Sequence, residues 1–314
     1  MKIYHSIEDF ENVSFPVLTT GTFDGVHLGH KTILDRLNAI AKNDNGESVL
    51  LTFSPHPRIV LFPEQNDLKL LTTREEKIAL LEHSGVDHLI IHPFTREFSR
   101  LGSVEFIRDV LVNRLQIKKL VIGYNHHFGR NREGSLEHLL ECGPVYGFDV
   151  EEIPAADIDN VNVSSTKIRN ALHNGDLSTA KSYLGHDYSL TGVVIKGEGR
   201  GTDIGYPTAN IEIENPIKLI PANGVYAVYI TISGTRYKAM MNIGVRPTVS
   251  GNTDTAERTI EINVFDFSRD IYGQSVRVTM IDKIRDEVKF DSVKELAAQL
   301  AVDKDSALYL LNTN

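Results

Sequence analysis

The spacing of hydrophobic residues divides the chain into two regions of different character. In the first region, short apolar runs alternate with segments whose apolar residues recur at helical spacing. Strands are predicted at residues 15–21, 47–55, 87–94 and 118–124, and helices at residues 33–40, 74–85, 104–116 and 164–176. This alternation implies crossover connections, and therefore an α/β domain with a parallel sheet and helices on its faces.

The second region begins near Tyr188 and consists of short strand-like runs. These runs are rich in β-branched and aromatic residues, and Gly, Asn or Pro turns separate them. They occupy residues 189–197, 223–244, 258–267 and 274–285. The pattern predicts an antiparallel sheet or a small β-barrel, followed by a terminal helix over residues 292–310. We place the boundary near residues 184–188, which gives domains 1–186 and 187–314.

Composition narrows the class of protein without naming a reaction. A length of 314 residues fits about two domains, and 41% hydrophobic with 24% charged residues is ordinary for a globular protein. No apolar run is long enough to span a bilayer, and the single cysteine, Cys142, fits a reducing compartment. A net charge of −9 argues against broad nucleic-acid binding. We therefore expect a cytoplasmic protein with no membrane and no nucleic-acid partner.

The stretch GTFDGVHLGH at residues 21–30 follows a predicted strand and opens a predicted helix. The N-terminus of a helix attracts anions, and His27 and His30, three positions apart, lie on one helix face. Both imidazoles can then donate hydrogen bonds to a phosphate group. A metal site that includes His56 is disfavoured, because a helix N-terminus repels cations and no cysteine cluster is present. Simple packing of the two histidines is the third alternative.

Two motifs resemble the H-x-G-H nucleotidyltransferase superfamily, which has a Rossmann-like fold. GTFDGVHLGH looks like its signature, and VSSTKIR at residues 163–169 is similar to its second motif, I-S-S-T-x-I-R. The resemblance implies that His27 and His30 are catalytic. It also implies that the ATP phosphates contact further residues of both motifs: Gly21, Phe23, Asp24, Gly29, Ser165, Thr166 and Arg169.

Two further segments resemble the prokaryotic bifunctional FAD synthetases. They are TFSPHP at residues 52–57 and VIGYNHHFGRNREG at residues 121–134. The resemblance implies that His56, Phe62 and Asn125 line the flavin site of an FMN adenylyltransferase domain. Loop packing is the alternative for His56 and Phe62. His127 departs from the family pattern, in which a basic residue such as Arg is common.

A second candidate site follows the predicted boundary, in KGEGRGTDIGYPTANI at residues 196–211. A glycine-rich backbone can wrap polyphosphate through its N–H groups. GYPTAN closely matches the riboflavin kinase motif G-[FY]-P-T-A-N, which implies that Thr208 and Asn210 hold Mg²⁺. The ATP-binding residues implied by the same motif are Gly197, Gly199, Gly201, Gly205 and Pro207.

The barrel region needs a group that accepts a proton if it phosphorylates an alcohol. All 12 histidines lie at or before His186, so a carboxylate is the natural candidate. Glu261 matches the family glutamate ahead of DFSRDIYG at residues 266–273, which implies the role of general base. Arg285 is a candidate ligand of the flavin phosphate, with an ion pair to Asp286 or another acid as the alternative. Asn263 stands where relatives often have His or an aromatic residue.

Together the motifs predict a bifunctional enzyme of flavin cofactor synthesis. It would convert riboflavin and ATP into FMN, and then FMN and a second ATP into FAD and pyrophosphate, with Mg²⁺ accompanying the nucleotide. Two other hypotheses remain open. The C-terminal region could be a kinase relic or flavin sensor attached to an adenylyltransferase, or the whole chain could store flavin without chemistry.

Overall fold

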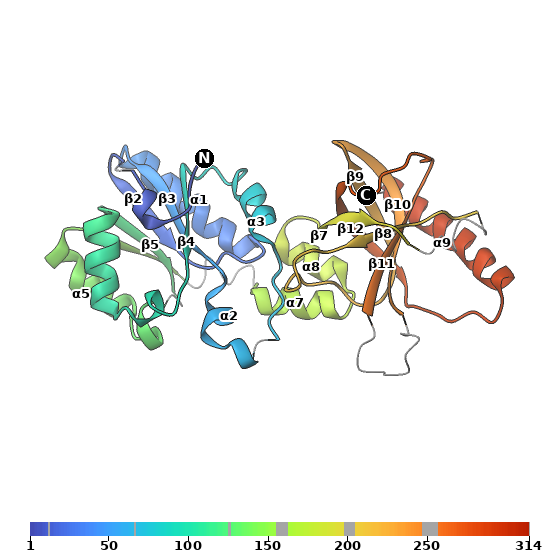
Figure 1. The fold of residues 1–314 in the computed structure, drawn as a ribbon. Helices are drawn as coiled ribbons and strands as arrows, with labels where there is room; N and C mark the ends of the chain where they lie inside the picture. Colours follow the sequence, from blue (N-terminus) through green and yellow to red (C-terminus); the bar gives the residue numbers. More distant parts are fainter. Residues whose placement is uncertain are drawn as a thin grey trace. The chain divides into compact units, whose positions relative to one another are not determined.

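The computed structural model describes residues 1–11, 13–65, 67–124, 127–154, 163–197, 205–246 and 257–313. The chain divides into two compact units, Met1–Ser165 and Thr166–Asn314 (Figure 1). Among the described residues, no helix has the length and apolar character needed to cross a membrane.

The first unit is built on a six-stranded sheet in the order β1-β4-β3-β2-β5-β6, and every pairing in it is parallel. The strands are β1 (Lys2–Tyr4), β2 (Pro16–Thr20), β3 (Glu47–Ser54), β4 (His88–Pro93), β5 (Lys119–Gly123) and β6 (Asp149–Ile153). The strand order reverses beside β2, where β3 lies on one side and β5 on the other. Open parallel sheets bind ligands at the carboxyl ends of the strands at such a reversal. The predicted α/β domain with a parallel sheet is confirmed.

Successive residues of a strand point to opposite faces of the sheet, and helices pack against both faces. Val17 of β2 packs in one core cluster with Leu34 and Leu37, whereas its neighbour Leu18 packs in another with Ile107. The helical elements of the unit are η1 (Ile7–Asp9), α1 (Leu28–Asn43), α2 (Pro57–Leu61), η2 (Pro63–Gln65), α3 (Arg74–Leu81), η3 (Phe98–Arg100), α4 (Ser103–Glu105), η4 (Phe106–Arg114), η5 (Arg130–Arg132) and α5 (Leu136–Tyr146). The helix predicted at residues 104–116 is present, but η4 within it is wound as a π-helix.

The second unit contains a closed antiparallel barrel in the order β10-β11-β8-β7-β12-β9, with β9 also paired to β10. Its elements are α7 (Ser165–His173), α8 (Leu177–Leu184), β7 (Ser189–Ile195), β8 (Ala209–Glu212), β9 (Gly224–Ile232), β10 (Thr235–Arg246), β11 (Glu257–Val264), β12 (Ser275–Arg285) and α9 (Val293–Thr313). Ala227 and Met240 pack in one cluster with Ala307 and Leu311 of α9, so the terminal helix covers the outer face of β9 and β10. The predicted barrel and terminal helix are confirmed.

The two helices α7 and α8 precede the barrel strands in sequence but pack with them. The Ala222 N–H, just before β9, donates to the Leu172 carbonyl of α7 at 3.0 Å. A side chain at Gly175 would meet the Lys283 side chain of β12. The compact units therefore divide after Ser165, whereas the change in sequence character lies near residues 186 and 187. Packing therefore places α7 and α8 with the barrel, whereas sequence composition places them with the first region.

Candidate active sites

The turn between β2 and α1 is held in an unusual backbone conformation. Phe23, Gly25 and Val26 have positive φ angles of 48°, 83° and 41°. The buried Asp24 carboxylate accepts hydrogen bonds from the Leu71 N–H at 3.0 Å and the Thr72 N–H at 3.1 Å. The motif implied a phosphate contact for Asp24. In the structure its carboxylate anchors the turn to residues 71 and 72.

The two histidines of the motif form a stacked pair at the start of α1. His27 caps the helix, since its Nδ1 accepts from the His30 N–H at 3.3 Å. The two rings lie 3.6 Å apart between centroids, with 12° between their planes, and the Phe23 ring lies 4.6 Å from His30. Gly29 is buried in the first turn, and a side chain at Gly21 would collide with the Phe23 ring.

His30 is held neutral by its surroundings. Burial lowers the pKa of His30 well below its ordinary value, and the charges of His27 and Lys77 add to this effect. The buried Nδ1 of His30 has no hydrogen-bond partner among the described residues. An unpaired acceptor is tolerated better than an unpaired N–H, so we assign the proton to Nε2. The neutral His30 is thus suited to donate a hydrogen bond to an anion and not to transfer a proton.

A buried lysine that the sequence reasoning missed lies under the same turn. The Lys77 ammonium of α3 donates to the Thr22 carbonyl at 3.2 Å and to the Thr52 hydroxyl at 3.1 Å. The Thr52 hydroxyl in turn donates to the Thr22 carbonyl at 3.1 Å. Burial lowers the pKa of Lys77 to about 8, although the nearby Asp24 carboxylate opposes this shift. In sequence, Lys77 is one charge in the helix REEK, and nothing there distinguishes it from a solvated residue.

Ser165 of the second motif lies on the first motif. Its hydroxyl donates to the Asp24 carbonyl at 3.2 Å, and both residues belong to the first unit. The other two motif residues also lie on α7: Thr166 is exposed and Arg169 is half-buried. Asn125 falls outside the described residues.

The remaining flavin-site candidates of the first unit lie around the short helix α2. His56 caps this helix, with its Nδ1 accepting from the Arg58 N–H at 3.2 Å. Phe62 ends the helix and is 53% exposed, beside the exposed Leu61. An apolar surface of this kind is available to a planar aromatic ligand. The flavin contacts of His56 and Phe62 stay predictions.

In the barrel, strand register brings the predicted base and amide groups into one row. Glu261 of β11 lies opposite Asn210 of β8 on one side and opposite Asn242 of β10 on the other. The row continues through Val225 of β9 to Arg285 of β12. Directly opposed residues project from the same face of a sheet. The carboxylate therefore stands between two amides on the outer face of the barrel.

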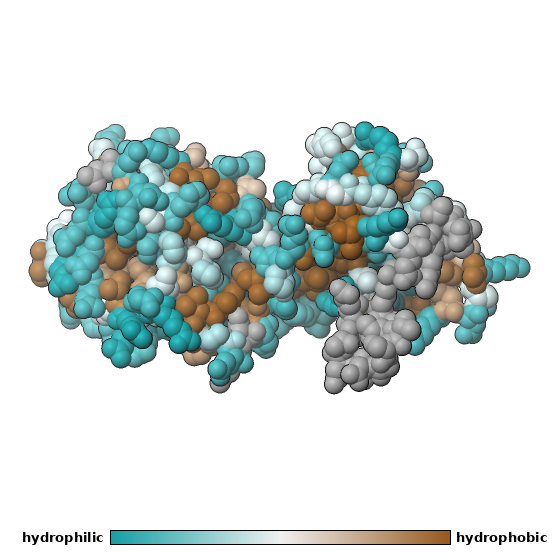
Figure 2. Space-filling model, in the orientation of Figure 1, coloured by the Kyte–Doolittle hydropathy of each residue, from teal (hydrophilic) through white to brown (hydrophobic). Residues whose placement is uncertain are grey.

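Four residues of this row line a cavity of about 410 Å³: Val225, Asn242, Glu261 and Arg285. Thr208, Asn242 and Glu261 line its polar part. Phe290, before α9, and Leu300 of α9 belong to its apolar part. The volume and the mixture of apolar surface with a few polar groups are typical of small-molecule sites. Hydrophobic residues also reach the surface over the barrel strands in Figure 2.

The GYPTAN segment is fixed against this wall. The Asn263 amide donates to the Pro207 carbonyl at 2.7 Å. Asn263, which departs from the family pattern, therefore positions the GYPTAN segment. Gly205 has a positive φ of 81°. A Cβ on Gly197 would lie 2.0 Å from the Asn210 amide nitrogen, so any larger residue there would displace this amide. Gly199 and Gly201 lie outside the described residues.

Arg285 lines the cavity but is held by an ion pair. Its Nε and Nη2 donate to the two carboxylate oxygens of Asp303 on α9, at 2.9 and 2.8 Å. Its Nη1 donates to the Asp286 carbonyl at 2.9 Å. The sequence left a flavin phosphate contact and an ion pair as alternatives. The structure contains the ion pair, with Asp303 as the acid.

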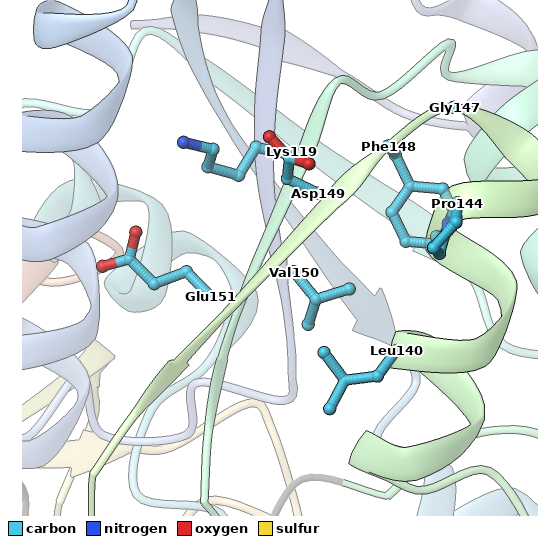
Figure 3. A pocket seen from close by; sticks show the side chains of 9 residues that line it. Lys119, Leu140, Pro144, Gly147, Phe148, Asp149, Val150 and Glu151 are labelled. Atoms are coloured by element: carbon cyan, nitrogen blue, oxygen red, sulfur yellow. The ribbon is translucent and has the colours of Figure 1, made fainter.

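A second cavity, of about 570 Å³, lies between α5 and β6 in the first unit. Figure 3 shows Leu140 and Val150 side by side in it, with Phe148 beside Pro144. Lys119 begins β5 and lies at the amino end of the sheet, opposite to the end that carries the His27 turn. This cavity is thus separate from the His27 turn.

Comparison with known proteins shows the family to which the chain belongs. A family model described as FAD synthetase matches residues 10–167, and one described as riboflavin kinase matches residues 184–311. The chain belongs to the bifunctional riboflavin kinase/FMN adenylyltransferase family. It is 37% identical to the protein of that name from Escherichia coli strain K12, over 93% of this chain and 91% of the relative. The Bacillus subtilis strain 168 relative is 34% identical, over 97% and 95%.

A solved structure shares the fold over almost the whole chain. It is named as a macrolide-efflux protein from Streptococcus pneumoniae, with a TM-score of 0.87, 33% identity and 97% of both chains covered. We take from this match the arrangement of the chain and not a role in macrolide efflux. The family predicted from the motifs is confirmed, and the two predicted activities are the ones that name it.

Proposed function

We propose that the barrel site transfers the γ-phosphoryl group of ATP to riboflavin, and that the first unit adenylylates the resulting FMN to FAD. The observation that carries the first half is the position of Glu261, on the wall of the barrel cavity beside Asn210. The His27 and His30 pair, at the reversal of the parallel sheet, supports the second half.

In the kinase step, the oxygen of the ribityl 5′-hydroxyl attacks the γ-phosphorus of ATP, and Glu261 accepts the proton of this hydroxyl. Asn210 and Asn242 flank the carboxylate and orient it. ADP leaves with the pair of electrons of the broken P–O bond. Positioning of this kind, with a base near the hydroxyl, is the main contribution that a protein makes to phosphoryl transfer.

The residues of the barrel site fit Mg²⁺. Thr208 lines the cavity and Asn210 follows it in the same extended segment, so a hydroxyl and an amide oxygen stand near the Glu261 carboxylate. Hard oxygen donors suit Mg²⁺, which keeps several waters and binds nucleotide phosphates. When bound, the ion neutralises charge on those phosphates. No group of three or more His, Cys, Asp or Glu suited to a metal is found in the part of the chain that the structure describes.

In the adenylyl transfer, the FMN phosphate attacks the α-phosphorus of ATP and pyrophosphate leaves. The nucleophile is already an anion, so this site needs no general base. His27 and His30 donate hydrogen bonds to the α-phosphate as its charge increases, and the start of α1 adds its dipole. By the family motif, Ser165, Thr166 and Arg169 contact the triphosphate.

A chromatographic time course with riboflavin, ATP and Mg²⁺ tests the proposal. We expect FMN to form first and FAD to follow, with one ADP and one pyrophosphate for each FAD. Added FMN should yield FAD and pyrophosphate without ADP. Riboflavin that stays unchanged while FMN still becomes FAD would contradict the kinase half. Binding of flavin with no nucleotide consumed would contradict both halves.

A further inference from the structure

The ion pair between Arg285 and Asp303 joins the end of β12 to α9 at the edge of the barrel cavity. Arg285 ends β12, Asp303 lies on α9, and Asp286 begins the segment between them. All three guanidinium nitrogens are used in these contacts. The Phe290 ring of the same segment lies 5.7 Å from the guanidinium carbon. The pair is therefore a junction and not a surface contact.

The Asp303 carboxylate is fully buried and fully engaged. Its exposed fraction is 0%, and it also accepts a hydrogen bond from the Gln299 amide at 2.9 Å. Burying two charges is costly, and an apolar pair of similar size often stabilises a fold as well or better. The directional contacts of an ion pair instead fix one geometry. Ala307 and Leu311 of α9 make apolar contacts with the barrel, and near the end of the helix the Tyr229 hydroxyl donates to the Leu311 carbonyl at 2.7 Å.

The position of α9 determines the shape of the cavity. Leu296 and Leu300 of α9 line it, and Asp303 is one turn further along the same helix. A shift of α9 against β12 would therefore move the apolar wall, while the polar wall of Asn242 and Glu261 on the barrel would stay in place. The ion pair is a directional contact within one turn of Leu300, whereas the Leu311 hydrogen bond lies about three turns further along α9, so the ion pair is the contact that sets this wall.

We propose that Arg285 and Asp303 are positioning residues that fix the apolar wall of the riboflavin site, and that Arg285 is not a ligand of the flavin phosphate. This inference rests on the proposed kinase function of the barrel cavity. It predicts that the pair controls recognition of riboflavin and leaves recognition of ATP unchanged.

The test compares Asp303→Asn, Arg285→Met and the double variant Arg285→Met/Asp303→Leu. Each single change leaves one buried polar group without its charged partner, so we expect the KM for riboflavin to rise at least about tenfold, with the KM for ATP unchanged. The double variant replaces the ion pair with apolar side chains and should return the KM for riboflavin to within about threefold of the unmodified protein. Asp286→Asn is the matched control, because that carboxylate is exposed and pairs with Lys283.

The competing role, in which Arg285 binds the flavin phosphate, predicts a different pattern. Riboflavin has no phosphate group, so if Arg285 instead binds the phosphate of FMN, no variant will raise the KM for riboflavin. Arg285→Met and the double variant will then weaken binding of the product FMN equally, and Asp303→Asn will not. An unchanged KM for ATP in the kinase reaction reports that the barrel of each variant is folded. If the unmodified protein makes no FMN, the proposed function fails. The inference is then tested by riboflavin affinity, measured without ATP from the quenching of flavin fluorescence. The same variants are compared, and the same pattern of weakened and restored affinity is expected.

Discussion

The candidate sites of the two units offer different side chains for the two phosphorus-transfer reactions. The first unit offers stacked imidazoles at a helix start and a buried ammonium under the same turn. The barrel offers a carboxylate between two amides, in a stretch of sequence with no histidine. The difference follows from the nucleophile. A phosphate needs donors and positive charge around the reacting group, whereas an alcohol also needs a proton acceptor.

The supporting contacts differ in the same way. In the first unit, the turn that carries His27 is held by main-chain groups and by Lys77, so its shape depends on residues 71–77. In the barrel, strand register alone aligns Glu261 with its neighbours. A site on a loop needs dedicated supporting residues, whereas a site on paired strands is positioned by the sheet.

Replacing the proton acceptor of the barrel should have the largest effect. We expect Glu261→Gln to lower the kcat of riboflavin phosphorylation by about 10²- to 10⁴-fold, the usual contribution of a general base. FMN adenylylation should stay at the level of the unmodified protein. Glu212→Gln, at an exposed carboxylate of β8, is the matched control and should change neither rate. A loss of less than about threefold for Glu261→Gln would remove Glu261 from this role.

Removal of one imidazole tests the other site. His30→Ala should lower FMN adenylylation by about 10²- to 10³-fold, as expected for a donor to a developing anion, and spare riboflavin phosphorylation. His83→Ala, at an exposed histidine after α3, should leave both rates unchanged. Because burial keeps the pKa of His30 well below its ordinary value, the adenylylation rate should not fall between pH 7.5 and about 6.5 through protonation of His30. A rate that follows an ordinary histidine titration would contradict the buried, neutral assignment.

A change in the glycine-rich segment should act through Asn210. The Cβ of Gly197→Ala would lie 2.0 Å from the Asn210 amide nitrogen, so the amide must move away from its place beside Glu261. We expect riboflavin phosphorylation to fall at least about tenfold, while adenylylation is unchanged. Steady-state rates of both reactions measure this effect. An unchanged kinase rate would show that the position of Asn210 is unimportant for the reaction.

The smallest predicted effect is a pH dependence of stability. Burial lowers the pKa of Lys77 to about 8, whereas its ordinary value is 10.5. Between these values the unfolded state binds more protons than the folded state, so stability due to Lys77 is lowest below pH 8 and increases as the pH rises. Relative to Lys77→Met, the unmodified protein should gain about 2 kcal/mol in the free energy of unfolding between pH 7 and pH 10. Urea denaturation at the two pH values measures it, and a constant difference would contradict the buried ammonium.

Most of the architecture was predictable, because alternating apolar runs and motif order are local properties of the sequence. The parallel sheet, the barrel and the terminal helix follow from hydrophobic period, and both motifs lie where that pattern places them. The supporting residues were not predictable. Lys77 is 55 positions from Thr22, and Asp303 is 18 positions from Arg285, so neither contact has a local signal. Arg285 is the clearest example, since the motif identified this residue in the sequence but could not predict that Asp303 is its partner.

The most direct test of two separate sites is a mixing experiment. Glu261→Gln and His30→Ala are assayed with riboflavin, ATP and Mg²⁺, first alone and then together. We predict that neither variant alone makes FAD at an appreciable rate, since one stops before FMN and the other stops at FMN. The mixture should make FAD, because FMN released by His30→Ala is used by Glu261→Gln. FAD formation by either variant alone, or none in the mixture although added FMN is adenylylated, would contradict the account.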